Sequence, residues 1–159
     1  MSGRVWRRRV RWLAALVGLC ALATVPIGVR ACRATRRGAE ASTVLGLLVD
    51  RARALAAAGQ PWPTSAVGPT PPVGACCAQA DGVCAVDLAA WGDPTWKALA
   101  MTLDDPHRYS YAYEPTPTGA RLRAIGDLDC DKVLATFTAE LTRVGDTVTV
   151  RFRREHPDE

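Results

Sequence analysis

Apolar residues follow three patterns along this chain, and each pattern predicts a different kind of element. Residues 12–29 are mainly apolar and carry no charge. In residues 35–59 apolar positions recur every three or four residues, which is typical of a helix with one buried face. From Tyr109 onward apolar and polar residues alternate, which is typical of half-buried strands. The chain is therefore expected to begin with helix and to end with sheet.

The apolar run over residues 12–29 is long enough to cross a membrane. A bilayer core of about 30 Å needs roughly 20 apolar residues in a helix. Arginines flank the run on both sides, and no small-x-small cleavage site follows it. We expect an uncleaved anchor preceded by a basic cytoplasmic N-terminus, residues 1–11. A cleaved signal peptide and a buried helix of a soluble protein are the alternatives.

The segment after this run is expected to continue it as one long, kinked helix. Pro26 bends a membrane helix without ending it, and Gly59 is a typical helix stop. Residues 12–29 are then the membrane-spanning half of the helix, and residues 30–59 its amphipathic half. The expected buried positions are Ala39, Thr43, Leu47, Leu48, Ala52 and Leu55, and the polar positions on other faces are Glu40, Asp50, Arg51 and Arg53.

Residues 60–86 are expected to form an extended connector and a cysteine loop. Five prolines between positions 60 and 75 exclude a regular helix or a central strand. Residues 87–101 then predict a short, broken helix in which Asp93 is the N-cap and Pro94 the first helical residue. Its expected buried side chains are Trp91, Trp96 and Leu99.

Strand-like runs with turn residues between them fill the rest of the chain. Short connections join antiparallel neighbours. The expected fold class is α+β, in which the long N-terminal helix packs on a four-stranded antiparallel sheet. Residues 87–152 hold the short helix and this sheet, and residues 153–159 form a polar tail. The four runs cover residues 109–114, 120–125, 133–142 and 147–152.

The charge of the chain changes sign along its length. Residues 1–37 carry nine arginines and no acidic residue, whereas the remainder has 11 basic and 16 acidic side chains, a net charge of −5. A domain that binds nucleic acid through its phosphates needs a concentrated basic face. We therefore expect no nucleic-acid partner.

Four cysteines of the C-terminal part predict disulfides, and with them an extracytoplasmic compartment. Because adjacent cysteines close a strained ring, two connectivities remain open. One pairs Cys76 with Cys84 and Cys77 with Cys130, and the other exchanges these partners. Zinc is the rival interpretation, but the spacing lacks the paired C-x2-C of common structural zinc sites.

The segment Asp127-Leu128-Asp129-Cys130-Asp131 is the sharpest candidate for a binding site. Alternate aspartates in a turn can converge on calcium, which prefers oxygen ligands. The EF-hand pattern is incomplete, because Lys132 and Thr138 occupy its glycine and glutamate positions. The alternative is an acidic turn in which Asp127, Asp129 and Asp131 cap backbone amides. Apart from calcium, no cofactor is expected.

Catalytic chemistry has little support in the remaining residues. The chain contains two histidines, His107 and His156, without a recognisable nucleophile or metal-ligand partner, and both are expected to be exposed. The alternating Tyr109, Tyr111 and Tyr113 are expected in the core of the sheet rather than in a ligand platform. We expect a protein that is not an enzyme.

The stretch from Cys76 to Phe137 resembles the globular domain of type IV pilin-like proteins of myxobacteria and their relatives. The residues that carry the resemblance are the adjacent cysteines, WKAL at 96–99, DPHRYSY at 105–111 and GDLDCD at 126–131. The resemblance implies a long N-terminal helix laid on a small antiparallel sheet. The prepilin leader, with its glycine, phenylalanine and early glutamate, is absent from residues 1–29. Leader cleavage and N-methylation are therefore not expected.

Together these features predict a single-pass protein of the bacterial inner membrane, with a periplasmic C-terminal domain. The expected function is that of a non-enzymatic structural or accessory subunit of a type IV pilus or type II secretion-type system. Its partners would be the membrane, through residues 12–29, and other pilin-like subunits or secretion components. The alternative is a free-standing anchored module that binds a cell-envelope ligand, for which an exposed aromatic patch near Trp62 or Trp91 would be the sign.

Overall fold

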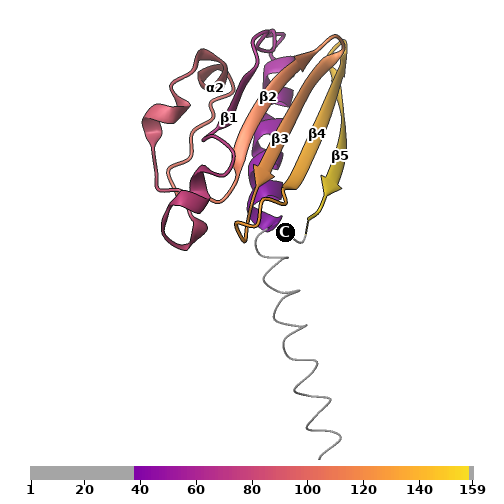
Figure 1. Ribbon diagram of the computed structural model, residues 1–159. Coiled ribbons are helices and arrows are strands. Elements are labelled where there is room, and N and C mark those ends of the chain that lie inside the picture. The colour runs from indigo at the N-terminus through magenta and orange to yellow at the C-terminus, as the bar shows by residue number, and fades with distance from the viewer. Residues whose placement is uncertain (1–37, 158–159) are drawn as a thin grey trace, which may run out of the picture. The chain divides into compact units, whose positions relative to one another are not determined.

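A five-stranded antiparallel sheet organises the part of the chain that the computed structural model describes, residues 38–157. The strands lie in the order β1-β2-β3-β4-β5, so each strand pairs with its neighbour in sequence (Figure 1). The four long strands match the four predicted runs, because alternating burial and intervening turn residues define each of them. Their bounds are β1 Val67–Thr70, β2 Ser110–Thr116, β3 Gly119–Gly126, β4 Ala135–Val144 and β5 Thr147–Glu155.

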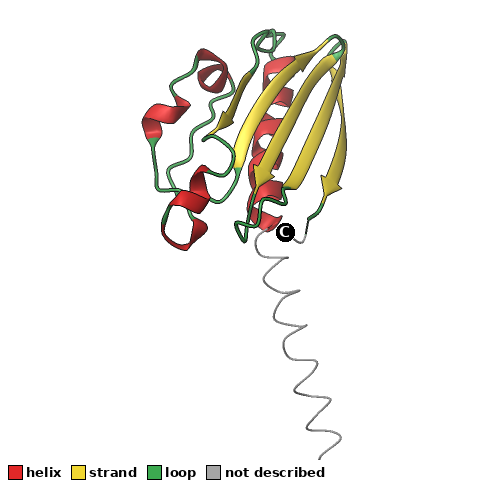
Figure 2. Ribbon diagram, viewed as in Figure 1, coloured by secondary structure: helices red, strands yellow, loops and turns green. Residues whose placement is uncertain are grey.

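A helix over residues 38–57 covers one face of the sheet (Figure 2). Its contact face is turned away from the predicted one: Leu48 and Ala52 are buried as expected, but Thr43 is exposed and Leu47 is 43% exposed. An alanine-rich helix offers several faces of similar apolarity, so periodicity alone chose the wrong one. The buried residues are Ala41, Leu45, Leu48, Val49, Ala52 and Ala56.

The prediction of one long N-terminal helix on a four-stranded sheet is wrong. The sheet has five strands, and between residues 38 and 157 no helix is long and apolar enough to cross a membrane. The predicted cytoplasmic segment 1–11 and membrane segment 12–29 lie outside the described residues. β5 also continues to Glu155, into the segment predicted as a polar tail.

The fifth strand comes from the proline-rich connector, where no strand was predicted. β1 lies at the edge of the sheet and pairs with β2, with an irregular register between Val67 and Thr70. Proline is tolerated at an edge because the missing N–H has no ladder partner to lose. Gly68 has a φ of +88°, and a Cβ there would collide with the carbonyl oxygen of Tyr111, so only glycine fits this close approach.

Short helical turns connect β1 to β2 and follow the predicted caps. The Asp93 side chain accepts a hydrogen bond of 2.7 Å from Thr95 N and caps α2, whose first residue is Pro94. Asp87 caps η3 in the same way through Ala89 N. The predicted broken helix is thus confirmed. The elements are η1 Ala75–Ala78, η2 Ala80–Gly82, η3 Leu88–Trp91 and α2 Pro94–Ala98.

The core lies between the 38–57 helix, the sheet and these short turns. The tyrosine row of β2 is buried, as predicted, and so are Trp91, Trp96 and Leu99. Trp91 and Trp96 meet edge to face with ring centroids 5.5 Å apart. The loop-rich segment therefore contributes its aromatic side chains to the same core that the helix and the sheet form.

Candidate functional site

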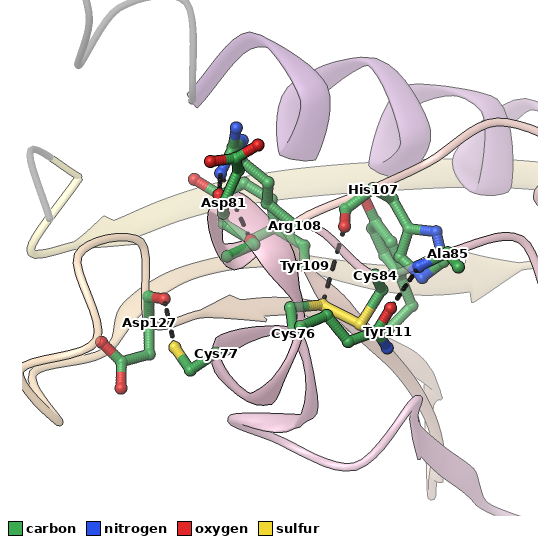
Figure 3. Close-up of a disulfide and its surroundings, with 12 residues drawn as sticks. Cys76, Cys77, Asp81, Cys84, Ala85, His107, Arg108, Tyr109, Tyr111 and Asp127 are labelled. Atoms are coloured by element: carbon green, nitrogen blue, oxygen red, sulfur yellow. Dashed lines mark hydrogen bonds between the residues drawn. A yellow bond between two sulfur atoms is a disulfide. The ribbon is translucent and has the colours of Figure 1, made fainter.

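All four cysteines of the domain are paired, and the pairing is the first of the two predicted connectivities. Cys76 bonds to Cys84 within the loop (Figure 3). Cys77 bonds to Cys130 across 53 residues of sequence. The two adjacent cysteines face different segments. Cys76 Sγ lies 3.6 Å from the carbonyl oxygen of His107, which pairs with Cys84 in an isolated antiparallel bridge, whereas Cys77 Sγ lies 3.2 Å from the carbonyl oxygen of Asp127. The first disulfide closes a small loop, and the second ties that loop to the acidic turn after β3. Cysteines engaged in this way do not form the rival zinc site.

His107 is a structural residue of this loop rather than an exposed histidine. Its backbone exchanges hydrogen bonds with Cys84, at 2.8 and 3.2 Å. Its ring is buried against Trp91, with centroids 6.1 Å apart. The prediction that His107 is exposed is therefore wrong, because the bridge to Cys84 draws the residue into the core. His156 is exposed, as predicted.

The acidic turn between β3 and β4 brings its three aspartates together. Carboxylate oxygens of Asp127, Asp129 and Asp131 lie within 4.8 Å of one another. Oxygens bound to one calcium ion at about 2.3–2.6 Å lie at most roughly 5 Å apart, so this spacing fits the ion. The donor set consists of hard carboxylate oxygens, which also fits. The predicted calcium site thus has compatible geometry and stays a prediction.

Two of these aspartates, Asp127 and Asp131, also perform the capping role of the alternative interpretation. Lys132 N donates to Asp127 Oδ2 at 3.2 Å, and Val133 N donates to Asp131 Oδ1 at 2.7 Å. Asp127 Oδ1 is buried, and no residue among 38–157 bonds to it. Capping uses one oxygen of each of these two carboxylates, so the other oxygens remain available to a cation. The two roles are compatible.

The backbone of the acidic turn is held in an unusual conformation. Cys130 and Lys132 both have positive φ, +66° and +77°, although neither is glycine. The disulfide from Cys77 fixes the turn between the outer two aspartates, and Cys77 Sγ lies 3.2 Å from the carbonyl oxygen of Asp127. The cysteine loop therefore sets the position of the carboxylates.

Glu40 is the polar residue of the core that sequence reasoning missed. Its carboxylate, on the 38–57 helix, accepts hydrogen bonds from Arg108 N at 3.0 and 3.1 Å, from Tyr109 N at 3.2 Å and from the Tyr111 hydroxyl at 3.2 Å. Burial, and then the negative charge of Glu40, raise the pKa of Tyr111 well above its usual range. Glu40 thus fixes the helix to the start of β2, nearly 70 residues away in sequence. Nothing in the sequence around Glu40 indicates that its carboxylate binds residues so far along the chain.

Two further polar groups fasten the connector to the core. The Tyr113 hydroxyl donates to Pro63 O at 2.7 Å, and burial raises the pKa of Tyr113 to about 12. Trp62 Nε1 donates to Ala52 O at 2.7 Å. Trp62 is half-buried and Trp91 is buried, so these two residues do not form the exposed aromatic patch that would favour the binding-module alternative.

Comparisons of the chain with protein-family models, with curated proteins and with solved structures give no match.

Proposed function

We propose that the protein is a non-catalytic, membrane-anchored subunit, structural or accessory, of an extracytoplasmic assembly of the type IV pilus or type II secretion kind. The observation that carries the proposal is the complete pairing of Cys76, Cys77, Cys84 and Cys130 in two disulfides. Disulfides persist in oxidising compartments such as the periplasm and are rare in the cytosol.

The apolar run over residues 12–29 supports the anchored part of the proposal. It precedes the disulfide-bonded domain and is long enough for one membrane passage. The motifs between Cys76 and Phe137 support the kind of assembly.

Intact-mass measurement of the protein from its native membrane, without reductant, tests the compartment and the anchor. We expect an uncut N-terminus and the loss of four hydrogens that two disulfides require. Crosslinking in the same membranes then tests the assembly, and we expect crosslinks to pilus or secretion components. Free thiols would contradict the extracytoplasmic placement, and an absence of any such crosslink or co-purification would contradict the role as a subunit.

A further inference from the structure

The two edges of the sheet differ in their capacity to accept another strand. At one edge β1 has four residues, contains Pro69 and has an irregular register. At the other edge β5 has nine residues without proline or glycine, and within residues 38–157 it pairs with β4 alone. An edge of this length presents a row of free N–H and C=O groups, on which an extended segment can add as a further strand.

The two faces of β5 present different side chains to an added strand. Val148, Val150 and Phe152 lie opposite the helix-covered side chains of β4, whereas Arg151 and Arg153 lie opposite Glu140 and Thr138 on the other face. None of the ion pairs among the described residues includes an arginine of β5. An added strand would therefore meet Val148, Val150 and Phe152, followed by Arg154, on one side and the unpaired charges of Arg151 and Arg153 on the other.

A pocket beside β5 marks where an apolar side chain of that strand would fit. It has a volume of about 160 Å³ and lies between the 38–57 helix and β5. Phe152 is 56% exposed at its rim, and Arg154 lies over the Phe137 ring at 5.8 Å. The residues that line it are Ser42, Leu45, Phe137, Phe152, Arg153 and Arg154.

We propose that β5 is a docking edge for an extended segment of a partner protein in which apolar and acidic residues alternate. Charge selects this occupant over the others. β5 has three arginines and one glutamate, a net charge of +2, so a second copy paired through the same edge would place +4 along one seam. Residues 1–37 of this chain carry nine arginines and no acidic residue, and they are excluded for the same reason. This docking edge stands whether or not the protein is a membrane-anchored subunit.

A fluorescent nine-residue peptide of alternating valine and glutamate tests the edge. Its binding to the full, oxidised chain in mild detergent is compared with that of a valine–lysine peptide, at low ionic strength. We expect the glutamate peptide to bind about tenfold more tightly, because exposed ion pairs with Arg151 and Arg153 replace repulsion. Amide exchange should slow along Thr147–Glu155 and not along Val67–Thr70. Equal binding of the two peptides, no binding, or protection at β1 would overturn the proposal.

Two protein variants distinguish binding at β5 from nonspecific binding of the peptide. Reversing Arg151 and Arg153 to glutamate should invert the preference toward the lysine peptide. Filling the pocket with Ser42→Trp should weaken the glutamate peptide about fivefold, the effect of one apolar side chain. Thr43→Trp is the matched control, since Thr43 is exposed on the same helix and does not line the pocket. An unchanged preference in the charge variant, or equal weakening by both tryptophans, would count against the edge. Sedimentation that shows self-association through β5 would identify a second copy as the occupant and would also overturn the proposal.

Discussion

In the sheet region, which comprises the 38–57 helix with β2 to β5, long elements bury a continuous apolar layer. In the cysteine region, residues 71–108, the elements are only three to five residues long, and two disulfides start there. Long helices and paired strands hydrogen-bond most of their backbone N–H and C=O groups, and they stabilise each other by burying apolar surface. Short turns cannot do this, so covalent links and a few large aromatic side chains hold them. The cysteine region should therefore be destabilised most by loss of its disulfides, and the sheet region by loss of buried apolar side chains.

The largest expected effect is loss of the long-range disulfide. Replacing Cys77 and Cys130 by alanine frees a segment of 53 residues in the unfolded chain and should cost about 4 kcal/mol of unfolding free energy. Replacing Cys76 and Cys84, which are eight residues apart, should cost about 2.5 kcal/mol. Urea denaturation without reductant measures both. If losing the Cys76–Cys84 disulfide lowers the unfolding free energy more, the disulfides do not stabilise the protein mainly by reducing the entropy of the unfolded chain.

The next effect tests burial in the sheet region. Leu48→Ala removes a fully buried side chain between helix and sheet and should cost about 3 kcal/mol. Leu47→Ala, at a position 43% exposed, is the matched control and should cost under about 1 kcal/mol. Denaturation midpoints under the same conditions compare the two. Equal costs would favour the helix face predicted from periodicity, which buries Leu47 and Leu48 together.

Glu40 joins the two regions, and its removal should cost about 2 kcal/mol. Glu40→Ala leaves the N–H groups of Arg108 and Tyr109 and the Tyr111 hydroxyl without their acceptor. Asp50→Ala, on the exposed side of the same helix, should cost little. In Glu40→Gln the pKa of Tyr111 should fall, but it should stay above its ordinary value, because burial is the larger cause. Urea denaturation compares the variants, and equal costs of Glu40→Ala and Asp50→Ala would contradict the contact.

Alkaline pH should weaken the link between the sheet region and the connector. The pKa of Tyr113 is about 12 in the folded protein and about 10 when unfolded, so its contribution is complete below pH 10 and is lost as pH rises toward 12. Between pH 9 and pH 11 wild type should lose about 1.4 kcal/mol more than Tyr113→Phe. Stability curves of the two proteins at several pH values give the difference. Parallel curves would mean that the Tyr113 hydroxyl is not protected in the fold.

The smallest effect concerns the acidic turn where the two regions meet. With a dissociation constant of about 1 mM, calcium at about 5 mM should stabilise the protein by about 1 kcal/mol. Magnesium at the same concentration should do less, because it demands a tighter octahedral site. The melting temperature with each ion measures the effect, and the double variant Asp129→Asn with Asp131→Asn is the control. Equal melting temperatures with and without calcium would leave the turn with its capping role alone.

Local sequence rules predicted much of this fold. Period-two alternation and turn residues located the four long strands, and an aspartate before a proline located the start of α2. β1 was missed because Pro69 and the prolines around it argue against a strand, but proline excludes only a strand that has neighbours on both sides.

The features that could not be predicted depend on residues far apart in sequence. The rotation of the 38–57 helix follows from the Glu40 contact with residues 108–111, which no local pattern encodes. The choice between two disulfide connectivities follows from the packing of Cys76 against His107, beside Cys84, and of Cys77 against Asp127, near Cys130. Of the candidate site, the convergence of Asp127, Asp129 and Asp131 was visible in their spacing, whereas the sequence left open whether Cys76 or Cys77 fixes the turn through Cys130.

The Glu40 contact also determines when the helix can pack during synthesis of the chain. The 38–57 helix is synthesised early. The groups that bind the Glu40 carboxylate lie in residues 108–111, and much of the core that covers the helix's apolar face lies in β2 to β4. At roughly 5–20 residues per second, the 65 residues from Leu48 to Tyr113 take roughly 3–13 s. During that interval the apolar side of the helix faces water or a chaperone. Arrested chains that end near residue 105 should thus be cut by protease within residues 38–57, and chains that extend through β4 should resist.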